Sequence, residues 1–373
     1  MSRADLLPSG NIQNIHYGDI LIKYGAILDI ECESVPSIVH GKESKGTPYL
    51  RDGDVIIADT AEDETVGKCC EIINVNGTKI ESGLHTIPCR PMRSFSPMFL
   101  GYYMNSHYYH KQLFPLMQGV KVLSISRSNI GTTMISAPCS RSEQTRIVNL
   151  LHLIDNRIRK QQQVIDTLKK YKRGLLKQTF SDISESYRSS KLRDLVYVSG
   201  GKTPSMNNSL YWNGDIVWIS SKDMKSNRIY DSELKITTLA LNEMTLFPPG
   251  TLLLVVRSGI LKHTLPLSVL EVEATINQDI KALQVHGCNS LYLYYAILAR
   301  EDNIIRTHVK TGTTVQSLMM DSFMDIEIPI VDIEQQQIIA SKLSKIERYV
   351  ERHKKVLLEL MHMRVGLLQQ LFI

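Results

Sequence analysis

The chain has 373 residues, of which 43% are hydrophobic and 22% charged, a balance that excludes wholesale disorder and allows two or three folded domains. No run of about 18 apolar residues occurs, which excludes a transmembrane helix. The N-terminus lacks the basic-then-apolar pattern of a signal peptide, so we expect a cytoplasmic protein. The net charge of +5 is too small to indicate a class of binding partner.

Residues 1–142 are predicted to form the first globular domain. Short apolar runs alternate with clusters of Gly, Pro, Asn and Asp, which is typical of a mixed α/β fold with substantial strand content. Gly53 precedes the run DVIIADT, which indicates a buried strand, and the apolar segment FLGYYM follows at residues 99–104.

Residues 143–180 are predicted to form one long helix of about 50 Å. Its apolar residues recur at alternating spacings of four and three, the heptad of a coiled-coil seam. The seam residues are Ile147, Leu151, Ile154, Ile158, Ile165, Leu168 and Leu175. Gln161 and Lys172 interrupt this seam with polar side chains, which cost stability but fix the register of a helix pair.

Residues 181–333 are predicted to form a second α/β domain, in which Gly250 precedes the run TLLLVVR and the segment LYLYYA follows at residues 291–296. Residues 334–373 are predicted to form a second long helix with the same heptad. Its seam residues are Ile338, Leu343, Ile346, Val350, Leu357, Leu360 and Leu367. His353 and Arg364 interrupt it.

The two long helices are copies of one another. Both open with Glu-Gln and close with Gly-Leu-Leu-x-Gln-x-Phe, and after a one-residue slip near the start the offset is 192. The polar interruptions occupy the same positions at this offset. The order domain, helix, domain, helix indicates tandem duplication with a pseudo-twofold. We expect antiparallel helices, each polar interruption facing a polar residue or a carboxylate, because a buried unpaired charge is costly.

All of the excess positive charge lies on the two helices. Residues 141–180 carry ten Lys or Arg against three Asp or Glu, and residues 334–373 carry seven against four. Residues 1–140 have a net charge of −2 and residues 181–333 of −3. The charged helix faces are either solvated surface or a contact for nucleic acid or an acidic partner, and the domains are not general electrostatic DNA binders.

The sequence offers no catalytic constellation and no metal site. Gly200–Thr203 resembles the end of a phosphate-binding loop, but Val196 stands where that loop needs its first Gly. His107 and His110 could share one helical turn, and residues 233–235 could be half of a nuclease element, but neither has the required acidic or thiol partner nearby in sequence. The six cysteines form no CxxC, so reduced thiols are expected.

This duplicated order resembles the specificity subunit of type I restriction-modification enzymes. In the first helix the resemblance rests on Glu143-Gln144, Ile154-Asp155, Leu168-Lys169 and GLLKQTF at 174–180. In the second helix it rests on Glu334-Gln335, Ile346-Glu347 and GLLQQLF at 366–372. The second domain adds WISSKD at 218–223, NQDI at 277–280 and GTTV at 312–315.

The resemblance implies two target recognition domains, each reading one half of a split DNA site, joined by an antiparallel coiled coil that sets the spacer. It implies that the helices dock two methyltransferase subunits carrying S-adenosylmethionine, that ATP-dependent motor-nuclease subunits join for cleavage, and that this chain is not an enzyme and holds no cofactor. Residues 191–195 match the family's usual first strand, which the first domain lacks before residues 14–20. We therefore expect either a diverged N-terminus or an incomplete first domain.

Short hydroxyl and basic side chains near strand ends can contact phosphates and base edges of DNA. We therefore select such residues as candidate DNA contacts. In the second domain these are Ser220, Ser221, Lys222, Arg257, Lys262, Thr313 and Thr314. In the first domain they are Lys23, Arg51 and Arg127. Two other hypotheses stay open: a structural coiled-coil adaptor without DNA affinity, and a standalone nuclease or methyltransferase.

Overall fold

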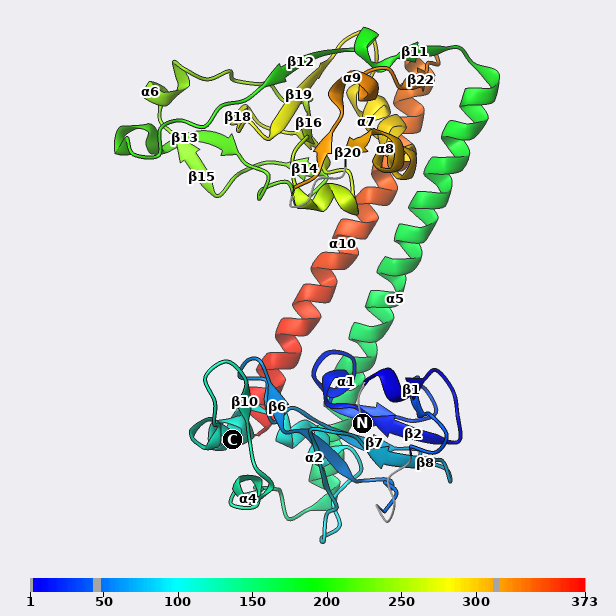
Figure 1. Cartoon of the computed structure of the whole chain (residues 1–373), viewed down its shortest axis with the longest axis vertical. Helices are drawn as coiled ribbons and strands as arrows, with labels where there is room; N and C mark the ends of the chain where they lie inside the picture. Colours follow the sequence, from blue (N-terminus) through cyan, green and yellow to red (C-terminus); the bar gives the residue numbers. More distant parts are fainter. Residues whose placement is uncertain (1–2, 43–47, 311–314, 373) are drawn as a thin grey trace. The chain divides into compact units, whose positions relative to one another are not determined.

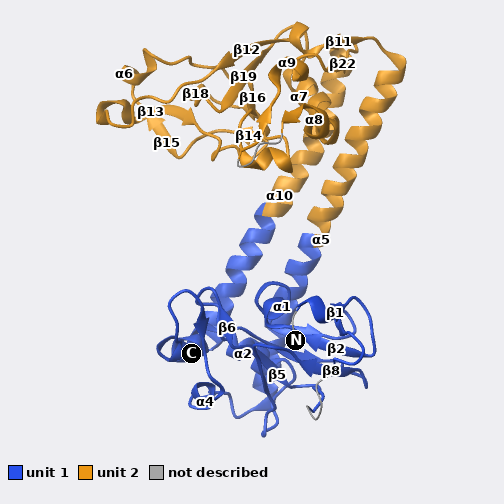
Figure 2. Ribbon diagram, viewed as in Figure 1, with its two compact units in different colours: residues 1–162, 355–373 blue, residues 163–354 orange. Residues whose placement is uncertain are grey.

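The computed structural model describes residues 3–42, 48–310 and 315–372 (Figure 1). The chain divides into two compact units (Figure 2). Unit 1 comprises residues 1–162 and 355–373, and unit 2 comprises residues 163–354. Both units therefore contain part of each long helix, and their limits cut across the segments expected from the sequence. In the described part of the chain, no helix has the length and apolar character needed to cross a bilayer.

Ten α-helices are assigned in the described residues. They are α1 (Tyr17–Ile22), α2 (Phe99–Met104), α3 (His107–Leu113), α4 (Arg127–Ile130), α5 (Arg141–Ser186), α6 (Thr238–Leu241), α7 (Ser290–Ala299), α8 (Glu301–His308), α9 (Met320–Phe323) and α10 (Ile333–Leu371). Helix α5 continues beyond the expected end at residue 180, because no Gly or Pro stops it and Ile183 is still buried in the core of unit 2.

The described residues of unit 1 form two four-stranded sheets and one short pair. The first sheet has the order β1 (Leu6–Leu7), β4 (Ser37–Ile38), β2 (Ile12–Ile15) and β8 (Lys79–Ser82). The second has the order β3 (Ile27–Asp29), β7 (Cys69–Ile73), β5 (Val55–Ala58) and β9 (Thr86–Cys89). The pair is β6 (Thr60–Ala61) with β10 (Leu123–Ser124).

In unit 2, outside residues 311–314, the strands form a five-stranded sheet, a three-stranded sheet and two pairs. The larger sheet has the order β12 (Val196–Gly200), β19 (Ile280–Val285), β16 (Leu252–Val255), β17 (Leu267–Leu270) and β14 (Arg228–Ile229). The smaller has the order β15 (Leu234–Ile236), β13 (Trp212–Ile219) and β18 (Ala274–Ile276). The pairs are β11 (Ser189–Lys191) with β22 (Glu327–Pro329), and β20 (Val309–Lys310) with β21 (Ser317–Leu318).

The two units repeat one strand topology. In unit 1, β3 runs parallel to β7, and β5 is antiparallel to both β7 and β9. In unit 2, β14 runs parallel to β17, and β16 is antiparallel to both β17 and β19. Likewise β2 is parallel to β8, and β13 to β18. Unit 2 adds β12 beside β19, whereas β9 ends the described sheet of unit 1. The strand expected at residues 191–195 is wrong: Lys191 ends β11, Leu192–Asp194 form a 3-10 helix, and β12 begins at Val196.

The strands expected after Gly53 and Gly250 are β5 and β16. All four residues of each strand are buried, as a core strand requires. Both glycines have φ angles near +85°, which a residue with a side chain rarely adopts. The same turn therefore leads into the same central strand in both units.

The long helices contribute to both cores. In unit 1, Phe372 at the end of α10 packs on the rings of Phe99 and Tyr103, with centroids 5.7 and 5.5 Å away. In unit 2, Phe180 of α5 packs on Tyr292, with centroids 5.3 Å apart. Each Gly-Leu-Leu-x-Gln-x-Phe segment thus anchors its helix in the unit other than the one in which that helix begins.

The helices run antiparallel within each unit. Asp155 of α5 pairs with Arg364 of α10 in unit 1, and Lys172 of α5 pairs with Glu347 of α10 in unit 2. From the first pair to the second, the residue number rises by 17 on α5 and falls by 17 on α10, so both pairs belong to one antiparallel register. Lys172 and Arg364 therefore meet carboxylates, as expected for polar residues in a seam.

Most seam residues are buried or half-buried, and Ile338 departs from the expectation. Its side chain is 48% exposed, whereas Ile339 packs against the core of unit 2 and Gln336 is buried. At 100° per residue, the buried face of α10 starts with Gln336, Ala340 and Leu343, which turns Ile338 outward. The one-residue slip assumed in the sequence alignment placed the seam one position too early.

Glu71 joins β7 to the start of α2. Its carboxylate accepts hydrogen bonds from the backbone N–H groups of Met98, at 2.7 Å, and Gly101, at 2.8 Å. A Cβ atom at Gly101 would lie 2.4 Å from the Ala26 carbonyl oxygen, so only glycine lets the helix approach this closely. Burial raises the pKa of Glu71 to about 7, although these hydrogen bonds favour the charged form.

We expect Glu71 to make the stability of unit 1 fall between about pH 4.5 and pH 7. A carboxyl whose folded pKa is raised binds more protons folded than unfolded in this window, so rising pH favours unfolding. The loss is at most about 3 kcal/mol. Urea unfolding of the wild type and Glu71→Gln at pH 5.5 and pH 8 checks this: the variant should lose the pH dependence that Glu71 causes. An equal pH dependence of the unfolding free energy in the wild type and the variant would contradict the role given to Glu71.

Candidate nucleic-acid interface

The buried ion pair of unit 2 ties the long helices to a loop of the domain. Glu347 is buried, and it accepts hydrogen bonds from the Tyr295 hydroxyl, at 2.9 Å, and from Asn227 Nδ2, at 2.7 Å, in addition to Lys172. Burial and the Glu347 carboxylate raise the pKa of Tyr295 well above its usual range, so its hydroxyl stays a donor. Asn227 follows the Ser220–Lys222 segment, so this network fixes the far end of that loop on α10.

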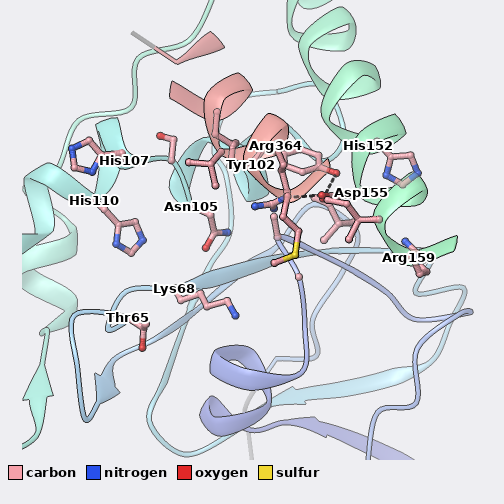
Figure 3. A pocket seen from close by; sticks show the side chains of 18 of the residues that line it. Thr65, Lys68, Tyr102, Asn105, His107, His110, His152, Asp155, Arg159 and Arg364 are labelled. Atoms are coloured by element: carbon pink, nitrogen blue, oxygen red, sulfur yellow. Dashed lines mark hydrogen bonds and ion pairs between the residues drawn. The ribbon is translucent and has the colours of Figure 1, made fainter. Parts of the chain in front are cut away.

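Unit 1 has the same network with the charges exchanged between the helices. Asp155 of α5 accepts from Arg364 Nε of α10, at 2.5 Å, and from the Tyr102 hydroxyl, at 3.0 Å (Figure 3). At the offset of 192, Asp155 corresponds to Glu347 and Arg364 to Lys172. The duplication therefore preserved a tyrosine, a carboxylate and a base, not only apolar residues.

A glutamine in each unit makes a second repeated contact. Gln144 accepts from the Ser96 N–H through Oε1, at 2.9 Å, and donates to the Pro138 carbonyl, at 2.8 Å. Gln336 accepts from the Asn289 N–H, at 2.7 Å, and donates to the Val331 carbonyl, at 2.8 Å. Gln144 and Gln336 are also 192 residues apart, so the structure aligns the helix starts without a slip.

A groove of about 790 Å³ lies in unit 2 between α5, the loop after β13 and the start of α8. Its basic side chains are Lys169, Lys172, Arg173, Lys177, Lys222 and Lys225. Its acidic side chains are Glu301 and Asp302. Glu301 is already engaged, because it accepts hydrogen bonds from the hydroxyl of Thr264 and the backbone N–H of Leu265.

The cavity of unit 1, of about 1140 Å³, is drawn in Figure 3. Its basic residues are Lys23, Lys68, Arg159 and Arg364, and its acidic residues are Asp29, Glu33, Glu64 and Asp155. His107, His110 and His152 also line it. Burial lowers the pKa of both His110 and Lys68, and Lys68 donates to the Leu21 carbonyl at 2.7 Å. This cavity is therefore balanced in charge, unlike the groove of unit 2.

The candidate DNA contacts of the second domain separate in the structure. Ser221 and Lys222 line the groove of unit 2, whereas the Ser220 hydroxyl donates to Asp223, at 2.7 Å, and closes the loop. Lys262 is exposed in the Gly259–Lys262 turn, whose Ile260 reaches the groove, and Arg257 is exposed just after β16. Thr313 and Thr314 lie outside the described residues.

The candidates of the first domain do not form a cluster. Lys23 lines the cavity of unit 1 and donates to the Ser34 carbonyl. Arg51 is exposed in the turn before β5, and Arg127 is exposed at the start of α4. Neither residue lines the cavity. The structural counterpart of the Ser220–Lys222 loop is His16–Gly18, which follows β2 as that loop follows β13.

Four basic residues of the unit 2 groove were not selected from the sequence: Lys169, Arg173, Lys177 and Lys225. The signal that could have found three of them is the charge excess of residues 141–180. The sequence shows that excess but does not show which face of α5 borders the domain.

The residues of the enzyme motifs rejected from the sequence make ordinary structural contacts or line the unit 1 cavity. Lys235 pairs with Asp231, four residues earlier, at 3.2 Å, and the Glu233 N–H donates to Asp223. His107 and His110 lie on α3 beside Asn105 in the unit 1 cavity (Figure 3). Within residues 3–42, 48–310 and 315–372, no group of three or more His, Cys, Asp or Glu side chains is arranged to hold a metal ion.

Comparison with known families concerns mainly unit 2. Residues 184–362 match the type I restriction modification DNA specificity domain. The matched segment includes the loop with Ser221 and Lys222, the sheet around β16 and most of α10.

Two curated relatives are specificity subunits. Over 153 residues the chain is 40% identical to the specificity subunit of the type I restriction enzyme EcoR124I/EcoR124II from Escherichia coli, covering 40% of this chain and 38% of that protein. Over 171 residues it is 34% identical to the MjaIX specificity subunit from Methanocaldococcus jannaschii, covering 44% and 39%. The matches span about two fifths of each relative, and they confirm the resemblance found in the sequence.

A solved structure is similar over the whole chain. The S subunit of a type I restriction-modification system from M. genitalium has a TM-score of 0.59 and 14% identity, covering 100% of this chain and 91% of that chain. At this identity the likeness shows the fold. The expected class, mixed α/β with two globular domains and two long helices, is confirmed.

Proposed function

We propose that this chain is the DNA sequence-recognition subunit of a type I restriction-modification complex. Each globular domain reads one half of a split site, and the chain itself is not catalytic. The observation that carries this proposal is the DNA specificity domain at residues 184–362, whose sheet order and helix contacts recur in unit 1. A duplicated reader suits a bipartite site, because each half-site then has its own domain.

The alternatives are a structural coiled-coil adaptor without DNA affinity and a standalone nuclease. The family match supports DNA recognition over the adaptor. No observation on the described residues favours the nuclease.

The partners we propose are two methyltransferase subunits and the motor-nuclease restriction subunits, acting in the cytoplasm. S-adenosylmethionine and ATP are held by those subunits and not by this chain. Each unit offers an exposed apolar surface on a long helix: in unit 1, Val356 and Met363 lie seven residues apart on α10 and are exposed. Val164 and Tyr171 occupy equivalent positions on α5 and are also exposed. An exposed apolar row at heptad spacing suits a helix of another protein.

We expect the isolated chain to bind DNA at least about tenfold more weakly than its complex with methyltransferase subunits, because phosphate neutralisation supplies much of the affinity. The net charges of residues 1–140 and 181–333 are −2 and −3. Fluorescence anisotropy and footprinting at physiological salt, with and without the methyltransferase subunits, measure the difference. Nanomolar, sequence-specific binding by the isolated chain would contradict the expectation. Absence of any footprint in the full complex would instead favour the adaptor.

A further inference from the structure

The groove of unit 2 and the cavity of unit 1 use the same five positions of the repeated helix. In unit 2 these are Lys169, Lys172, Arg173, Leu176 and Lys177 of α5. In unit 1 they are Met361, Arg364, Val365, Leu368 and Gln369 of α10, each 192 residues later. The two spaces are thus equivalent parts of the duplicated fold.

The equivalent positions differ in charge. Two of the five positions are alike in both helices: the base of the ion pair, Lys172 or Arg364, and the buried leucine, Leu176 or Leu368. The other three are basic in α5 and uncharged in α10. Among all lining residues, unit 2 has six Lys or Arg against two acidic residues, whereas unit 1 has four against four. The two spaces share these helix positions, but the excess of positive charge lies in only one of them.

The charges of the unit 2 groove are available to a ligand. Arg173 and Lys177 both pair with Asp302, at 3.1 and 2.6 Å. All three side chains are at least half exposed, and ion pairs between exposed groups are weak. Lys222 and Lys225 are exposed on the facing loop. Along α5, the positions from 169 to 177 span about 12 Å, comparable with three or four phosphates of one strand measured along the DNA axis.

We propose that the unit 2 groove binds the sugar-phosphate backbone of duplex DNA beside the half-site that this unit reads, and that the unit 1 cavity does not. The inference rests on the proposed function. Lys169, Arg173 and Lys177 contact phosphates from the helix, and Lys225 contacts them from the loop. Lys172 stays with Glu347 and positions the helix.

An acidic protein segment is the other ligand that fits positive charge. Protein interfaces usually include exposed aromatic or apolar anchors at their centre, whereas DNA interfaces are more polar and more positive. Of the apolar residues that line this groove, Leu176, Leu265 and Met224 are buried, and Ile260 is 49% exposed. The exposed lining is therefore mainly basic, as a DNA interface requires. The groove is also continuous with the loop of the DNA specificity domain that carries Ser221 and Lys222.

The test uses the full-length chain assembled with its methyltransferase subunits and two duplexes, one carrying the mapped site and one scrambled. The variant is Lys169→Gln, Arg173→Gln and Lys177→Gln combined. We expect affinity for both duplexes to fall by the same factor, about tenfold or more. The slope of log K against log salt should fall by about 2 to 3, close to 0.9 for each phosphate that the variant no longer neutralises. The matched control replaces Arg146, Lys160 and Lys170 of α5, which are exposed outside the groove, and should change the slope little.

Two further variants should act in the opposite direction. Asp302→Asn removes the acidic partner of the groove and should strengthen binding to both duplexes several-fold. Met361→Lys, Val365→Arg and Gln369→Lys give the unit 1 cavity the charges of its counterpart, and should raise the salt slope by about 2 to 3. These three side chains are exposed, so the change tests charge and not folding.

Two other outcomes would overturn the phosphate site, and a third would overturn the proposed function alone. An unchanged salt slope with weaker methyltransferase association would identify a protein segment as the ligand. A loss confined to the site-bearing duplex would make the groove a reader of bases. If the wild-type complex prefers no sequence but the salt slope still responds to the variants, the proposed function fails while the phosphate site stands.

Discussion

Replacing Glu347 with alanine is expected to destabilise unit 2 by about 3 to 5 kcal/mol, the typical cost of breaking a buried ion pair by removing one partner. The side chains of Lys172 and Glu347 are only 15% and 8% exposed. Without Glu347, the Lys172 ammonium stays buried without its carboxylate, and the Tyr295 hydroxyl and the Asn227 amide lose their acceptor.

The equivalent change in unit 1, Asp155→Ala, is the matched control and should cost about 1 kcal/mol. The Arg364 and Asp155 side chains are 27% and 23% exposed, so water can solvate the remaining base. Hydrogen exchange of α7 and of the unit 2 part of α10 measures the first effect, and exchange of α2 measures the second. Lys172→Met combined with Glu347→Met should recover part of the loss. Equal costs in both units would show that burial does not decide the strength of the pair.

Lengthening both helices by four residues is expected to lengthen the nonspecific spacer of the DNA site by up to about two base pairs. Four helical residues add about 6 Å, and each base pair of B-DNA adds 3.4 Å. The insertions belong after Lys160 in α5, between Arg159 and Gln162, and after Glu359 in α10. These positions face each other in the register of the observed ion pairs, so the Asp155–Arg364 and Lys172–Glu347 contacts are both retained.

Selecting bound duplexes from a random pool with the complex, and sequencing them, determines the spacer length and both half-site sequences. Insertion into α5 alone is the control, because it shifts one helix against the other and should reduce binding. An unchanged spacer in the doubly lengthened protein would show that the helices do not set the distance. Altered half-site bases would show that the insertion disturbed the recognition domains themselves.

The architecture could be predicted from the sequence because duplication leaves a constant offset. Heptads, matched polar interruptions and the Gly-led strands at Val55–Ala58 and Leu252–Val255 depend on local spacing, which a single sequence displays. Ile338 was misplaced because the alignment followed the Glu-Gln letters, whereas the structural equivalence is between Gln144 and Gln336, which make the same hydrogen bonds.

The candidate interface could be predicted only in part. Ser221 and Lys222, which line the groove, were selected because they follow a strand of recognisable sequence. Lys169, Arg173 and Lys177 were not, since the face of α5 that borders the domain depends on tertiary packing. The partners of Lys172 and Arg364 were expected to be polar residues or carboxylates. Which residues they are depends on a register between residues 175 and 209 positions apart in the chain.

Selection of random duplex DNA by the complex, with the wild-type chain and with Ser221→Ala and Lys222→Ala combined, tests the central claim most directly. We predict that the wild type enriches two short conserved blocks separated by a gap of fixed length and variable sequence. The variant should lose or alter one block and leave the other unchanged, because both substitutions lie in unit 2. A single uninterrupted motif, no enrichment, or the simultaneous loss of both blocks would contradict the reading of one half-site by each domain.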